Sequence, residues 1–203
     1  LAEYLDLPGT APAQNGPGLQ KIDAAPININ QKGTPLRHTF RTFTSIGKAK
    51  QLLFAQNQEM LKCLQADIGF RYIKFHGLLD DDMMVYSEGP DGSMELSFAY
   101  LDMAFDFLLS IRFKPLVELS FMPKALAKTP ERTLFFRESI ISLPKDLSRW
   151  EALILALLRH FEARYGRKEM ESWLFCLWNE PDSPSTMFGF EDAEAFFSFY
   201  KAT

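Results

Sequence analysis

WLFCLWNEP, residues 173–181, is the stretch that decides the fold of this chain. Residues 173–179 begin with a short apolar and aromatic run, which is typical of a buried β-strand. Pro181 cannot donate a hydrogen bond to a sheet, so the strand has to end before it. The strand therefore closes on an amide, Asn179, and a carboxylic acid, Glu180. Taken alone, an Asn-Glu-Pro tripeptide is more often a turn in which the acid is solvated. The rest of the chain therefore has to decide between a turn and a functional strand end.

Working outward, strand-like and helix-like apolar patterns alternate along the chain. We predict strands at residues 37–46, 70–76, 115–121 and 173–179, and helices at residues 48–65, 96–111, 147–165 and 191–203. This alternation favours parallel βαβ units with right-handed crossovers. Four such units are half of an α/β barrel of the TIM (β/α)8 type, and a small open α/β sheet is the alternative. A half barrel leaves two sheet edges, so we expect another chain, a swapped copy or the N-terminal segment to cover them.

The first residues differ in composition from the rest. Residues 1–34 are rich in Pro, Gly, Ala and Asn, which predicts a tail or linker with one short strand at residues 27–30. Residues 35–203 are predicted to be the N-terminal half of the barrel. Because the chain starts without Met and ends inside a helical pattern, we expect it to be a piece of a longer protein.

Composition excludes several classes of function. The 203 residues are 47% hydrophobic, enough for one sizeable core, and the net charge of -4 argues against a broad nucleic-acid footprint. Cys63 and Cys176 lack metal-ligand spacing and are predicted to be reduced core residues. No apolar run approaches transmembrane length and no signal peptide is present, so we expect a cytoplasmic protein without a membrane partner. We expect no metal and no cofactor.

Polar and aromatic residues gather where the predicted strands end. The set comprises Lys74, His76, Glu118, Ser120, Phe121, Asn179 and Glu180. In a parallel barrel these groups converge on one mouth, and such a mixture suits a sugar, which needs several hydrogen bonds and a flat aromatic surface. Each residue also has a structural interpretation: a lone histidine is often a satisfied structural group, and a lone phenylalanine is often core. Residues 80–82, three aspartates, lack the spacing of a calcium loop and are predicted to be a solvated loop or a helix N-cap.

Several longer motifs carry a family resemblance. They are FRYIKFHGLLDDDMMVY (70–86), KPLVELSFMP (114–123), PKDLSRW (144–150), RHFEARYG (159–166) and LWNEP (177–181). Together, from about residue 37 to residue 203, the chain resembles glycoside hydrolase family 39, whose best-known members are β-xylosidases. The resemblance implies a TIM barrel, a retaining mechanism and hydrolysis of β-xylosides.

The resemblance also implies roles for individual residues. Glu180 matches the general acid/base, and Asn179 matches the amide that hydrogen-bonds the sugar 2-hydroxyl. His76 matches a histidine expected to contact the sugar, and Phe121 matches an aromatic residue that lines the site. Lys74 stands where the family often has Arg and is expected to bind substrate, while Cys176 replaces an acid. The family's nucleophile, a Glu on a seventh strand, has no counterpart in this chain, so the isolated chain is predicted to be inactive.

A second class of function is open at this point. Residues 37–47 (RHTFRTFTSIG) and 80–86 (DDDMMVY) also resemble the family 39-like domains fused to DNA-binding regions in some transcriptional regulators of the AraC class. In that alternative the domain senses a sugar with little or no catalysis. Either way the expected partner is a carbohydrate, with no direct nucleic-acid contact from these residues. A homo-oligomer or a missing C-terminal half is expected to complete the barrel.

Overall fold

The computed structural model describes residues 30, 32–134, 138–184, 187–190 and 192–203. One compact unit, His38–Thr203, contains the helices and strands discussed below, and Leu1–Arg37 is a separate unit. Of the predicted strand at residues 27–30, Asn30 lies in a turn and the other residues are outside the described ranges.

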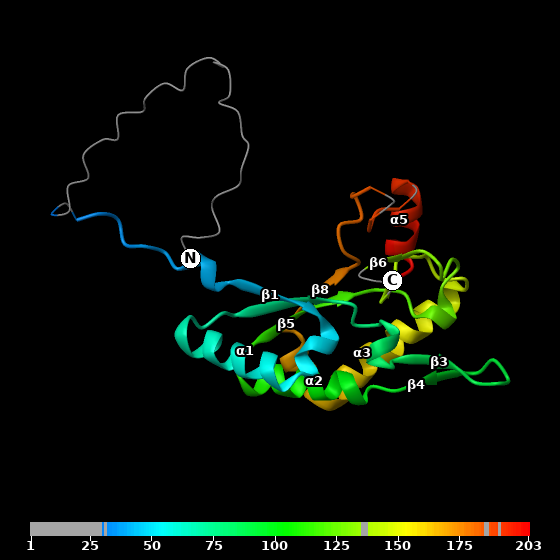
Figure 1. Ribbon diagram of the computed structural model, residues 1–203, viewed down its shortest axis with the longest axis horizontal. Coiled ribbons are helices and arrows are strands. Elements are labelled where there is room, and N and C mark those ends of the chain that lie inside the picture. The colour runs from blue at the N-terminus through cyan, green and yellow to red at the C-terminus, as the bar shows by residue number, and fades with distance from the viewer. Residues whose placement is uncertain (1–29, 31, 135–137, 185–186, 191) are drawn as a thin grey trace, which may run out of the picture. The chain divides into compact units, whose positions relative to one another are not determined.

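A four-stranded parallel sheet forms the centre of the unit His38–Thr203 (Figure 1). Its order is β1 (Phe43–Lys48), β2 (Tyr72–His76), β5 (Lys114–Leu119) and β8 (Leu174–Leu177). Every neighbouring pair in this sheet is parallel, which confirms the predicted alternation of parallel strands and helices. All four carboxyl ends therefore lie at the same end of the sheet.

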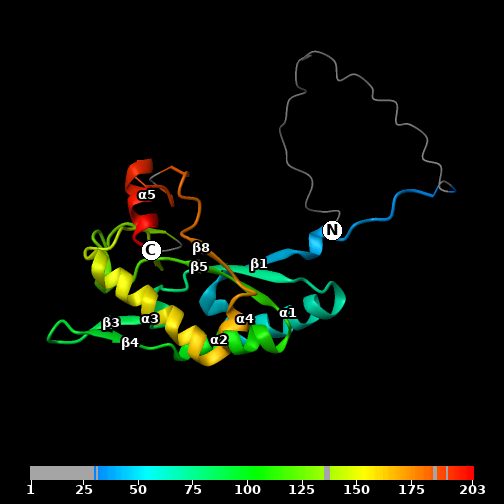
Figure 2. The ribbon, with the colours of Figure 1, turned by 180° about the vertical axis from the view of Figure 1, so that it is seen from behind.

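Helices connect the strands. They are α1 (Ala55–Asp67), α2 (Ala99–Ser110), α3 (Leu147–Tyr165), α4 (Arg167–Met170) and α5 (Ala193–Lys201). Figures 1 and 2 show α1, α2 and α3 on the same side of the sheet. A short 3-10 helix, η2 (Ala49–Leu53), precedes α1, so the helix predicted at residues 48–65 is broken at Phe54.

The longest helix follows its sequence signals closely. Asp146 caps α3 by accepting hydrogen bonds from the amides of Ser148 and Arg149. Gly166 ends it with a φ of 81°, a conformation that residues with a side chain rarely adopt. Between these signals Trp150, Leu157 and Phe161 recur on one buried face. The observed bounds, Leu147–Tyr165, are those predicted.

Within the described residues, two antiparallel strand pairs, three 3-10 turns and the short helix α4 are additions that the sequence did not predict. The strand pairs are β3 (Tyr86–Glu88) with β4 (Met94–Leu96), and β6 (Thr133–Leu134) with β7 (Ser139–Ile140). The turns are η1 (Thr39–Arg41), η3 (Asp81–Met83) and η4 (Lys124–Leu126). The turn η1 occupies the start of the strand predicted at residues 37–46, so that strand begins only at Phe43. Runs of two or three residues are too short to show a period.

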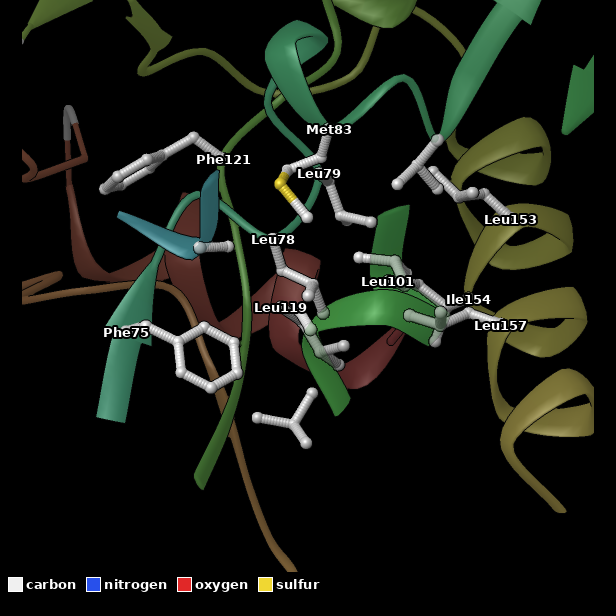
Figure 3. Close-up of a cluster of buried hydrophobic side chains, with 14 of the residues drawn as sticks. Phe75, Leu78, Leu79, Met83, Leu101, Leu119, Phe121, Leu153, Ile154 and Leu157 are labelled. Carbon is white, nitrogen blue, oxygen red and sulfur yellow. The ribbon is translucent and has the colours of Figure 1, made fainter. Parts of the chain in front are cut away.

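Alternate residues of the strands face opposite sides of the sheet. Ile73, Phe75 and Val117 belong to the side that the helices cover, and each is fully buried. Phe75 meets Phe105 of α2 edge to face, with ring centroids 5.9 Å apart. Figure 3 shows Leu101 of α2 beside Ile154 and Leu157 of α3, in the same apolar cluster. The main core therefore lies between the sheet and these helices.

The two cysteines differ from the prediction. Cys63 is exposed on α1, so its assignment to the core is wrong, whereas Cys176 of β8 is half-buried. Both are free thiols. Within the described part of the chain, no helix is long and apolar enough to cross a membrane.

Candidate active site

The carboxyl ends of β2, β5 and β8 bring most of the predicted site residues together. Lys74 and His76 lie on β2, Glu118 lies on β5, and Asn179 follows β8. Pairing of Lys74 with Leu116, and of Glu118 with Cys176, puts these side chains on the sheet side opposite the helices. Residues that are about 100 positions apart in the chain thus become neighbours.

Glu118 is the centre of this group. Its carboxylate accepts hydrogen bonds from Ser120 Oγ at 2.5 Å and from His76 Nδ1, which is 3.1 Å from both oxygens. Lys74 Nζ lies 3.0 Å from Glu118 Oε2. The Glu118 side chain has no exposed surface, although the Lys74 side chain is 33% exposed. A sugar carbon cannot reach Glu118 in this arrangement, which argues against a role as nucleophile.

Lys74 joins Glu118 to the residue before the candidate acid. Its Nζ donates a hydrogen bond to Asn179 Oδ1 at 2.9 Å, and Asn179 is buried. The same ammonium group therefore bridges β2, β5 and the segment after β8. Nearby, burial and the Glu118 carboxylate raise the pKa of the Cys176 thiol to about 11, although Lys74 opposes the rise.

Aromatic rings support this cluster. His76 packs near Phe188, with ring centroids 6.4 Å apart, and Phe188 stacks on Phe121 at 5.6 Å. Trp178 meets Phe121 edge to face at 5.2 Å and donates its indole hydrogen to the Phe188 carbonyl at 2.8 Å. Phe121 is fully buried, so in this structure it supports the site from within the core and does not line an open surface. Figure 3 shows it well apart from the α3 residues of the core.

Glu180 differs from its neighbours because it is exposed. The segment after β8 makes a sharp turn in which Trp178 has a φ of 64° and Glu180 a φ of 45°. Both values lie in the left-handed region, which is unfavourable for residues with a side chain. Within this turn, Trp178 and Asn179 are buried and Glu180 reaches solvent. The candidate acid is therefore accessible at the same end of the sheet as His76.

The acidic stretch at residues 80–82 agrees only in part with the predicted solvated loop or N-cap. Asp80 is the N-cap residue of η3 and Asp81 is exposed, but the Asp80 side chain is buried and makes no capping hydrogen bond. Lys48, the last residue of β1, places Nζ 2.8 Å from Asp80 Oδ2 and 3.0 Å from Asp82 Oδ2. Asp80 is buried and also accepts from Ser139 Oγ at 2.6 Å. Burial raises the pKa of Asp80, while Lys48 and Ser139 oppose the rise. Asp80 and Asp82 thus fasten the loop after β2 to β1, and no group of His, Cys, Asp and Glu in the described ranges could hold a metal ion.

Sequence reasoning missed the partners of Glu118 and two further contributors to this region, Lys48 and Phe188. A glutamate inside an apolar strand is a signal for a paired buried charge, so the partners of Glu118 could have been sought among the neighbouring strand ends. Lys48 and Phe188 gave no local signal, because their contacts come from segments far away in the chain.

Comparisons with known proteins agree with the motifs. The sequence profile of "Glycosyl hydrolases family 39" matches residues 24–203. A beta-xylosidase of Geobacillus stearothermophilus is 38% identical over 165 residues, which are 80% of this chain and 32% of that protein. A beta-xylosidase of Caldicellulosiruptor saccharolyticus is 42% identical over 144 residues, 71% of this chain and 29% of that protein.

Solved structures show the same likeness in three dimensions. A crystal structure of a monomeric beta-xylosidase from Caulobacter crescentus matches with a TM-score of 0.76 and 31% identity, over 86% of this chain and 35% of that chain. The chain spans about a third of the length of the relatives it matches. Since the family profile covers the whole of the unit His38–Thr203, this chain belongs to glycosyl hydrolases family 39.

Proposed function

We propose that the protein is a retaining β-glycosidase of the β-xylosidase type, in which Glu180 acts as the general acid/base. The observation that carries the proposal is the position of Asn179 and Glu180 directly after β8, at the same sheet end as His76. Lys74 holds the Asn179 amide, and Glu180 is exposed beside it. The likeness to beta-xylosidases supports xylosides as the substrate class.

The retaining mechanism needs a second carboxyl group, about 5–5.5 Å from the first, to attack the sugar. Glu118 is a poor candidate, because it is fully buried and held by Lys74, His76 and Ser120. We therefore place the nucleophile in the other half of a (β/α)8 barrel, outside these 203 residues. The two edge strands of the sheet carry exposed apolar side chains, Phe43 on β1 and Phe175 on β8. Such exposed edges support the proposal that further strands of a barrel adjoin them.

The experiment compares aryl β-xylosides with good and poor leaving groups. In the full-length natural protein, Glu180→Gln should slow the poor leaving group by about 10²–10⁴-fold, because that substrate needs a proton donor. A good leaving group should be affected much less in its first step. Glu171→Gln is the matched control, since Glu171 is also exposed but lies before β8, at the opposite end of the strand. Its activity should equal that of the unchanged protein.

The purified 203-residue chain provides the second arm. We expect no turnover, because a glycosyl-enzyme intermediate cannot form without the nucleophile. Turnover by this chain would contradict the proposal that the nucleophile lies outside these 203 residues. Full activity of Glu180→Gln on a poor leaving group would contradict the acid/base assignment. Sugar binding by the full-length protein without any turnover would instead favour the sensor alternative.

A further inference from the structure

We propose that Glu118 is a positioning residue that aligns two parts of the sugar site at once. Through Lys74 it fixes the side-chain amide of Asn179, and through a direct hydrogen bond it fixes the ring of His76. This inference rests on the proposed function, because it concerns residues of that same site.

The burial of Glu118 is the first argument. A carboxylate withdrawn from water is unfavourable unless charged or hydrogen-bonding partners surround it. Glu118 has no exposed side-chain surface, and its partners Lys74, His76 and Ser120 come from two adjacent strands and their ends. Ser120 is also fully buried. A buried charge whose partners lie at the strand ends indicates a positioning role for Glu118 in the site, in addition to any contribution to the stability of the sheet.

The second argument is the orientation of the Asn179 amide. Lys74 Nζ is 3.0 Å from Glu118 Oε2 and 2.9 Å from Asn179 Oδ1. An ammonium group can only donate hydrogen bonds, so the amide oxygen has to face Lys74 and the amide nitrogen has to face the other way. As long as Glu118 holds Lys74 in place, Asn179 presents a donor. Without that charge, the amide can rotate and present an acceptor instead.

The third argument is the tautomer of His76. A carboxylate only accepts hydrogen bonds, so the 3.1 Å contacts to both oxygens of Glu118 place the proton on Nδ1. In the neutral ring the other nitrogen, Nε2, is then an acceptor. With a neutral His76 ring, one buried carboxylate thus decides that Asn179 donates and that His76 accepts. A sugar hydroxyl can donate or accept a hydrogen bond. The donor role of Asn179 and the acceptor role of His76 therefore fix the direction of the hydrogen bond that a hydroxyl makes with each of them.

The kinetic experiment uses the full-length protein and a double-mutant cycle on an aryl β-xyloside. Glu118→Gln should lower kcat/KM by about tenfold, the effect of losing one charge-assisted hydrogen bond. In an Asn179→Ala background the same change should cost about threefold or less, because part of its action passes through Asn179. A purely structural role predicts equal factors in both backgrounds. Glu169→Gln is the control: it disrupts the Lys114–Glu169 pair at the other end of β5 and should leave kcat/KM unchanged.

A spectroscopic measurement needs no variant of Glu118. In ¹⁵N-histidine-labelled protein, with His76→Asn to assign the signal, the His76 ring should carry its proton on Nδ1. If Glu118→Gln does not fold, Lys74→Met replaces it in the cycle and should also be non-additive with Asn179→Ala.

The two proposals fail differently. Full activity of Glu180→Gln on a poor leaving group contradicts the proposed function, whatever Glu118 does. The positioning role is overturned if Glu180 proves essential while the His76 ring carries a proton on Nε2 and none on Nδ1, or while the cycle is additive.

Discussion

The two faces of the β1–β2–β5–β8 sheet are built from alternating residues of the same strands, yet they differ in burial, polarity and partners. On β2, Phe75 is fully buried under α2, whereas its neighbours Lys74 and His76 are only partly buried and bind Glu118. The covered face is an apolar core, in which Ile73, Phe75 and Val117 are fully buried. The other face holds a buried charge and its partners. The comparison suggests that stability resides on the helix-covered face and chemistry on the other.

The largest expected effect is a loss of stability when a buried side chain of the helix-covered face is truncated. Phe75→Ala should lower the free energy of unfolding by about 3–5 kcal/mol, because it removes a fully buried ring that packs on Phe105. Urea denaturation followed by circular dichroism measures the loss. Leu116→Ala is the matched control on the opposite face of β5: Leu116 is half-buried, so we expect a loss below about 1 kcal/mol. Equal losses at both positions would contradict the division between the two faces.

A smaller effect tests the electrostatics of the polar face. Burial, together with the nearby Glu118 carboxylate, raises the pKa of Cys176 to about 11. At pH 8 its thiolate fraction is therefore small, and iodoacetamide should modify Cys176 slowly. Glu118→Gln removes one of the causes and should accelerate modification of Cys176 by about threefold to tenfold. Peptide mass spectrometry follows both thiols, and exposed Cys63 on α1 is the internal control. An unchanged rate at Cys176 would show that the two side chains do not interact.

The smallest effect concerns the outer surface of the helical layer. Asp106 of α2 binds Arg164 of α3, and the hydrogen bond from Arg164 lowers the pKa of this carboxyl group from its usual value. Its stabilising contribution should be complete above the ordinary pKa and should disappear as the pH falls through the lower folded value. Both side chains are largely exposed, so Asp106→Asn should lower Tm only slightly at neutral pH. Calorimetry from about pH 7 to about pH 2 should show this difference vanish in acid. In an Arg164→Gln background the difference should be smaller at every pH.

Local patterns predicted the regular part of the fold well. The bounds of α3 follow from Asp146, Gly166 and a buried stripe between them, all visible in the sequence. The four parallel strands were placed to within a few residues, except that β1 starts six residues after the predicted start at residue 37. The roles of His76, Asn179 and Glu180 remain predictions, while their gathering at one end of the sheet follows from the parallel arrangement.

Long-range contacts account for what the sequence could not predict. Asp80 looked solvated because its partner, Lys48, is distant in the chain and only the pairing of β1 with β2 brings them together. Phe188 joins the aromatic cluster through a loop without any periodic pattern. The sequence places Glu118 near a strand end, but its surroundings are decided by Lys74 and His76, its partners on β2.

The left-handed backbone at Trp178 and Glu180 has an evolutionary consequence. Each residue is held in a conformation that costs about 1 kcal/mol or more, and a glycine would adopt it without that cost. Selection for stability alone would therefore drift toward glycine at position 180, where the side chain is exposed and little packing is lost. If Glu180 has the proposed acid/base role, selection for glycosidase activity would keep the glutamate despite its strain. Position 180 is thus a place where the two selective pressures oppose each other, and a library selected only for thermal tolerance should lose this residue early.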